Sequence, residues 1–476
     1  MSEKSIQDES QEWWDYPKCL EDYDPVVVDG DAITKRMKEL ASDLFTDEDS
    51  VDVQIIERYE SSEKTSVLTF SDENTLVFFI KADSRSSFPP NFRIISIPQT
   101  FSLSELSINR NCMQQLLVHF NVSLDFLNVL FKFGNQSHVF EESSGYTSVS
   151  LEPDGSYSVS YQLMYVEKNG RKPPKDPWSM RQTGVFHRYS SSNNTSLFIF
   201  LHPMKNSVAQ RRLEALFEKG DRAGALSQEA MDIHVLLFSS YLNNWQVYIE
   251  ELARIFKNLR EKILAFDVSR DVNYNLSPDT LKELRNLEDK VSFRTSACLR
   301  GAIRTIEALK TLYEAHTVDG FTRDSGSKKM YSSLSAMLNR LEGHFASVEI
   351  MQKRVGATIG LLANLLDLRN QSTSDKLNNH MLALTQETVD DNATVRVITI
   401  FSLIYLPASF VASLLGTNLF SFQASNRRFV ISTQFWIYVC VTIPLTVITL
   451  STWWLMKSQQ DKKRRQRRTQ GKKVEP

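Results

Sequence analysis

Short hydrophobic runs separated by polar turns characterise residues 50–205. The clearest runs are 66–70, 76–80, 92–97, 157–161 and 197–201. Turn signals lie between them, such as Asn169-Gly170, and this alternation is typical of β-strands. Residues 111–133 instead carry apolar positions at helical spacing. Strands mixed with helices indicate an α/β or α+β domain, and we expect an α/β domain over residues 31–205, after a disordered N-terminal segment, residues 1–30.

The pattern becomes helical from residue 206 onward. Long amphipathic stretches cover residues 228–266 and 277–315. A third stretch carries hydrophobic residues at alternating spacings of four and three, with one missed position: Leu334, Leu338, Leu341, Phe345, Val348, Val355, Ile359, Leu362 and Leu366. That spacing is a heptad seam. Because proline is absent from 329 to 406, we predict a long-helix bundle and a coiled-coil-like stalk over residues 206–394.

Two long apolar runs follow, at residues 395–415 and 435–456. The first contains one charge, Arg396, and the second contains none. Each is long enough to cross a hydrocarbon layer of about 30 Å. Trp436 and Trp453 lie near the two ends of the second run, where membrane interfaces favour aromatic residues. We predict two transmembrane helices joined by a loop, residues 416–434; a buried hairpin of a soluble protein is the alternative.

Charge predicts the orientation of these spans. The tail, residues 457–476, holds nine Lys or Arg against two acids, whereas the loop holds only Arg427 and Arg428. Basic segments remain on the cytosolic side, so both termini are expected in the cytosol, with the plasma membrane as the expected location. The tail could instead be a nuclear-type signal or a contact with anionic membrane lipid.

Composition and motifs exclude several other classes. The net charge of the 476 residues is −2, and the four cysteines show no CxxC spacing, which argues against a disulfide framework or a zinc site. The N-terminus lacks the features of a secretory signal. The eight histidines show no paired metal spacing, and no nucleotide-binding or hydrolase motif occurs. We expect neither an enzyme nor a bound cofactor, and no nucleic-acid partner.

One face of the first span is mildly polar. Its members are spaced by four and three residues: Val395, Thr399, Ser402, Leu406, Ser409 and Ser413. Small and hydroxylated residues can pack one membrane helix against another. The same hydroxyls can instead line a water-filled pore, with the apolar members forming constrictions. The residues alone leave both readings open, and we call this set the hydroxyl stripe.

Pro407 lies in the middle of the first span. It cannot donate a backbone hydrogen bond, and we expect it to kink the helix. Lipid cannot satisfy the freed carbonyl, so a neighbouring helix or water must do so. Two helices per chain cannot enclose a channel, and any pore therefore requires several copies of the chain.

The run VITIFSLIYLPASFVASLLGTN, residues 397–418, resembles the CorA-type magnesium transporter family, in which a similar helix ends in Gly-Met-Asn. Residues 176–189 are similar to the divergent fungal CorA-like branch. The resemblance implies a homopentamer that transports Mg²⁺ or a related divalent cation. Its pore would be lined by residues of the first span: Asn392, Val395, Ile398, Thr399, Ser402, Leu406, Ser409 and Ser413.

The resemblance also implies a mouth and an inner collar for this pore. Gly416, Thr417 and Asn418 would form the mouth, where the Asn418 amide could bind the water shell of Mg²⁺. The basic collar would comprise Arg396, Lys462, Lys463, Arg464 and Arg465. Thr417 replaces the family's methionine, and residues 419–434 contain no acid. A membrane-anchored scaffold that no longer conducts ions is therefore the alternative function.

Overall fold

The computed structural model divides the chain into two compact units, Met1–Leu366 (unit 1) and Asp367–Pro476 (unit 2). It describes residues 16–20, 26, 28–47, 50–59, 65–83, 89–134, 145–172, 174–218, 230–265, 278–318, 325–414, 420–423, 428–431 and 435–471. The α12 helix crosses from one unit into the other. This confirms the predicted order of a sheet-containing domain, long helices and two apolar C-terminal helices.

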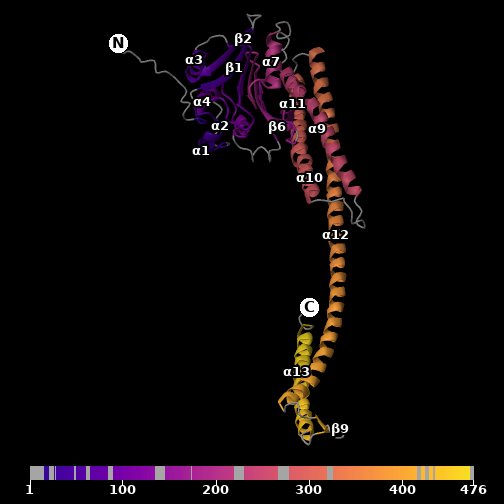
Figure 1. Cartoon of the computed structure of the whole chain (residues 1–476). Coiled ribbons are helices and arrows are strands. Elements are labelled where there is room, and N and C mark those ends of the chain that lie inside the picture. The colour runs from indigo at the N-terminus through magenta and orange to yellow at the C-terminus, as the bar shows by residue number, and fades with distance from the viewer. Residues whose placement is uncertain are drawn as a thin grey trace, which may run out of the picture. The chain divides into compact units, whose positions relative to one another are not determined.

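A mixed seven-stranded sheet forms the centre of unit 1 (Figure 1). Its spatial order is β2-β1-β3-β7-β6-β5-β4. The strands are β1 (Ser50–Arg58), β2 (Thr65–Asp72), β3 (Phe92–Pro98), β4 (Tyr146–Leu151), β5 (Tyr157–Lys168), β6 (Trp178–Ser190) and β7 (Thr195–His202). Only the β3–β7 pair is parallel among these ladders. Four of the predicted runs lie within these strands.

The run at residues 76–80 is instead part of a helix, α3 (Glu73–Asp83), so the strand prediction was wrong there. Leu76 and Ile80, four residues apart, are buried, while Phe78 between them is 75% exposed. That is the period of a helix. Asp72 accepts a hydrogen bond from the backbone N–H of Thr75 and so satisfies a donor of the first turn.

Helices cover the two faces of the sheet. One face carries α1 (Gly30–Glu39), α2 (Ala41–Leu44), α3, α4 (Arg110–His119), the 3₁₀ turn η2 (Leu124–Phe126) and α5 (Leu127–Leu130). On β3, Ile95 and Ile97 pack on this side, while Phe92 and Ile94 pack on the opposite side. Because both faces are covered, β3 is buried along its whole length rather than at alternate positions.

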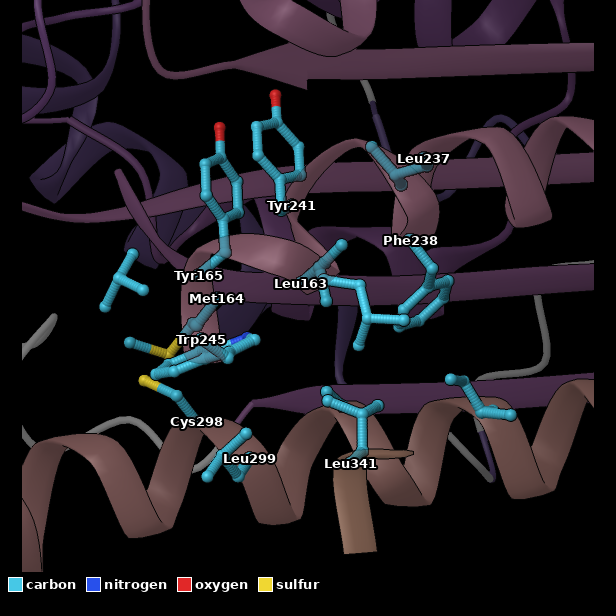
Figure 2. Close-up of a cluster of buried hydrophobic side chains, with 14 of the residues drawn as sticks. Leu163, Met164, Tyr165, Leu237, Phe238, Tyr241, Trp245, Cys298, Leu299 and Leu341 are labelled. Atoms are coloured by element: carbon cyan, nitrogen blue, oxygen red, sulfur yellow. The ribbon is translucent and has the colours of Figure 1, made fainter. Parts of the chain in front are cut away.

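The second face packs against the long helices of unit 1. These are α7 (Val208–Glu218), α9 (Asp232–Leu264), α10 (Pro278–Asp289), the π-helix η3 (Lys290–Thr295), α11 (Ser296–Val318) and the first part of α12 (Ser325–Leu414). Figure 2 shows part of their core, in which Met164 of β5 lies beside Trp245 of α9 and Cys298 of α11. The Tyr165 and Tyr241 rings stack with centroids 3.5 Å apart. Leu334, Leu341, Val348, Val355 and Leu362 of the heptad seam are buried in the same core.

The N-terminal segment differs from the predicted disorder at residues 16–20. Tyr16 and Leu20 are buried against the cluster that contains α1 and α4. Thr34 donates a hydrogen bond to the Tyr16 carbonyl, and Lys18 forms an ion pair with Asp31 at 2.6 Å. One aromatic and one aliphatic side chain, Tyr16 and Leu20, hold this segment against the domain, because each buries apolar surface.

Unit 2 comprises the rest of α12, a short hairpin and α13 (Phe435–Gly471). The hairpin strands are β8 (Phe420–Gln423) and β9 (Arg428–Ile431), which pair antiparallel. In Figure 1 the C-terminal part of α12 and the first part of α13 lie side by side. Unit 2 is therefore built as a helical hairpin.

Candidate functional site

Two stretches of unit 2 are long and apolar enough to cross a membrane: Val397–Leu414 of α12 and Phe435–Gln459 of α13. Their mean hydropathies are 2.0 and 1.8. Only 11% of the first stretch and none of the second is buried inside the chain. A core helix of a soluble protein would be mostly buried, so these exposed apolar surfaces require lipid or further protein.

The hydroxyl stripe lies on the side of α12 that faces away from α13. Pro407 and Val411 are buried, and they mark the side of α12 that packs within the helical hairpin of α12 and α13. Val395 and Leu406 are 59% and 65% exposed, and the three serines of the stripe are exposed too. At about 100° per residue, the mean direction of the stripe is about 120° from Pro407. The stripe is thus available to solvent, lipid or another copy.

The structure describes the side chains of only some of the other residues predicted for the pore, its mouth and its basic collar. Ile398 is 60% exposed and lies beside the stripe, and Thr399 donates its hydroxyl to the Val395 carbonyl at 2.7 Å. Asn392, Arg396 and residues 462–465 belong to α12 and α13, but their side chains lie outside the described residues. Gly416, Thr417 and Asn418 also lie outside them. Their roles stay predictions.

The sequence analysis missed a second row of hydroxyls, on α13. Thr446 donates to the Thr442 carbonyl at 2.8 Å, and Thr449 donates to the Thr446 carbonyl at 2.9 Å. These half-buried threonines lie on the same side of the helix as Tyr438, whose hydroxyl is 3.4 Å from the Ala408 carbonyl of α12. The spacing of four and three that revealed the first stripe is also present here. It identifies a small-residue seam between the two spans.

Unit 1 buries a hydrogen-bonded series of three polar side chains between its sheet and α9. The Tyr161 hydroxyl lies 2.7 Å from Nδ1 of His234, and Nε2 of His234 lies 2.9 Å from Nδ1 of His187. All three side chains are at most 1% exposed. Burial lowers the pKa of His234 to about 3 and that of His187 well below its usual value. Both rings are therefore neutral near pH 7. The hydrogen-bonded series of these three side chains links α9 to β5 and β6.

A second buried polar group lies on the other face of the sheet. Arg93 bridges Glu57 and Asp83, with N–O distances of 2.6 and 2.7 Å. Burial alone would raise the pKa of Asp83, but its hydrogen bonds to His119 and Arg93 and their charges outweigh this and lower it to about 2. Each acid is thus paired, as buried charges must be. Among the described residues, no three His, Cys, Asp or Glu side chains cluster in a way that could hold a metal ion.

Comparison with known proteins assigns the family. The family model of CorA-like transporters matches residues 8–264, more than half of the chain. The notoamide biosynthesis cluster protein M' of Aspergillus versicolor is 42% identical over 59 residues, which are 12% of this chain and 13% of that protein. The chain therefore matches about one eighth of the length of that curated relative.

Two solved structures resemble the chain at low sequence identity. Full-length CmaX is 13% identical, with a TM-score of 0.36, and the match covers 87% of this chain and 98% of CmaX. The ZntB cytoplasmic domain of Vibrio parahaemolyticus is 11% identical, with a TM-score of 0.28, over 65% of this chain and 98% of that domain. From the family match and its two exposed apolar helices, we conclude that the chain is an integral membrane protein that belongs to the family of CorA-like transporters.

Proposed function

We propose that the chain is a divalent cation channel, for Mg²⁺ or a related ion, whose pore is lined by α12 in a homo-oligomer. The observation that carries the proposal is the exposed hydroxyl stripe on the side of α12 that faces away from α13. Serine and threonine oxygens suit an ion that keeps its water shell, as Mg²⁺ does. A pentamer is the number that the family resemblance implies.

The apolar members of the stripe would act as constrictions. Val395 and Leu406 are both more than half exposed, and in a ring of copies each would form a hydrophobic collar. Such collars gate ion flow by excluding water. The hydroxyl levels between them would hold the hydrated cation, which enters past Asn418.

A scaffold that no longer conducts ions is the second candidate. Two features of the sequence favour it: Thr417 stands at the methionine position of the family motif, and residues 419–434 contain Arg427 and Arg428 but no acid. Positive charge at a pore entrance repels cations. The two functions differ in one measurable property, which is ion flux.

Influx of Mg²⁺ and Co²⁺ into proteoliposomes tests the proposal. We expect the wild-type oligomer to admit at least one of these ions, Asn418→Ala to abolish the influx, and Thr417→Met to raise it. If neither the wild type nor Thr417→Met admits either ion while the oligomer stays intact, conduction is excluded and the scaffold remains. Empty liposomes provide the leak control.

A further inference from the structure

Tyr405 has a hydroxyl that the described part of the chain leaves without a hydrogen-bond partner. It lies near the middle of the first apolar stretch and is 74% exposed. Among the described residues, no hydrogen bond to this hydroxyl is present. Tyrosine is favoured at membrane interfaces, where its hydroxyl reaches water. In the middle of a span the hydroxyl must find a protein acceptor or remain unpaired at a cost.

An acceptor exists at nearly the same depth. Pro407 has no N–H, so the Leu403 carbonyl lacks the hydrogen bond that residue i+4 normally donates in a helix. Lipid cannot supply a donor to this carbonyl. Along the helix axis, residues 403 and 405 differ by only about 3 Å.

The two groups lie on opposite sides of the hydroxyl stripe. At about 100° per residue, Tyr405 lies about 80° to one side of the mean direction of the stripe, and Leu403 about 80° to the other. Tyr405 is therefore too far around the helix to reach Leu403 of its own chain. In a closed ring whose lumen faces the stripe, each helix meets one neighbour on each of these two flanks.

We propose that the Tyr405 hydroxyl of each copy donates a hydrogen bond to the Leu403 carbonyl of the next copy in the ring. The inference rests on the proposed function, because it takes the lumen to be lined by the stripe. Each copy offers one donor and one acceptor, so a closed ring satisfies all of them. Tyr405 is then a positioning residue that sets the rotation of α12, and with it which side chains face the ion path.

A double-mutant cycle on the purified full-length oligomer tests this contact. Tyr405→Phe removes only the hydroxyl, and Pro407→Ala supplies the Leu403 carbonyl with a donor from its own helix. We expect Tyr405→Phe to weaken assembly about threefold per subunit contact, the size of an average side-chain hydrogen bond in a membrane. In the Pro407→Ala background, Tyr405→Phe should have no further effect. The readout is the denaturant concentration at which the oligomer dissociates.

Two control variants separate this contact from a general effect of hydroxyls. Tyr438→Phe removes the hydroxyl near Ala408, a carbonyl that keeps its own helical donor, and should show no coupling to Pro407→Ala. Phe401→Tyr combined with Tyr405→Phe moves the hydroxyl by one turn, and the oligomer should stay as weak as that of Tyr405→Phe. Circular dichroism verifies that all variants keep their helices.

Equal losses on Tyr405→Phe in both backgrounds, or no loss in either, would overturn the contact. This result is independent of conduction. Coupling without ion flux in the wild type would support the contact and reject the channel. Flux without coupling would support the channel and reject the contact.

Discussion

Two tryptophans, one from each unit, lie in opposite environments. Trp245 of α9 is 2% exposed, within the core of unit 1, whereas Trp436 of α13 is 71% exposed. Burial of apolar surface is the main driving force of folding in water. Unit 1 therefore completes its own core from one chain, while unit 2 leaves its apolar surface exposed. The proposed ion path lies in the unit that is incomplete alone.

The largest effect should follow from truncating a side chain in unit 1. Trp245→Ala leaves a cavity among β5, α9 and α11 (Figure 2), and we expect a loss of about 3–5 kcal/mol in the free energy of unfolding. Trp436→Ala is the matched control, and it should leave the unfolding of unit 1 unchanged. Chemical denaturation in detergent, followed by circular dichroism, measures both. Similar losses in the two variants would contradict the division between the units.

The pH dependence of stability should come from buried histidines of unit 1. Burial lowers the pKa of His202 to about 3, so between that pH and about 6.5 the unfolded chain binds a proton that the folded chain excludes. Stability must then rise with pH across this window and fall on acidification. For His202 alone we expect a loss of about 2 kcal/mol between pH 7 and pH 5.

His202→Asn is the variant that isolates this contribution. His202 contacts Ser96 and Ser207, and asparagine keeps a polar side chain there without a titrating group. The slope of the unfolding free energy against pH should decrease by about 1.4 kcal/mol per pH unit near pH 5. An unchanged slope would mean that His202 is protonated in the folded chain.

The smallest effect on stability should come from the stripe of unit 2. Leu406 is 65% exposed, and Leu406→Ala should change the unfolding of unit 1 by less than about 0.5 kcal/mol. It should nevertheless raise ion influx, because it widens a hydrophobic constriction. Ile404→Ala is the matched control, since Ile404 lies on the opposite side of α12 and should leave influx unchanged. Equal influx in both variants would remove Leu406 from the ion path.

Local patterns predicted some elements well and others poorly. The heptad seam and the two apolar stretches were evident because their period persists over many residues. The run at 76–80 was misread, since five apolar residues fit a strand and a helix equally and the cap at Asp72 decides between them. The threonines of α13 could have been found by the search that found the stripe on α12.

Contacts between distant segments could not be predicted. Nothing near His187 in the sequence indicates that its ring forms a hydrogen bond with the His234 ring. Nor does it indicate that the His234 ring forms a second hydrogen bond, with the Tyr161 hydroxyl. The same holds for Arg93 between Glu57 and Asp83. Each partner lies on a separate element, and the packing of the sheet against its helices brings them together.

The sequence by itself determined the sheet-then-helices order, the two apolar stretches and the hydroxyl stripe, because helical and strand periodicities are local. It also determined that Pro407 frees a carbonyl in the first stretch. Only the tertiary structure decided that Pro407 and Val411 face the inside of the helical hairpin while Tyr405 and the hydroxyl stripe face outward. Which side of a helix is covered depends on what packs against it, and that follows from residues far away along the chain.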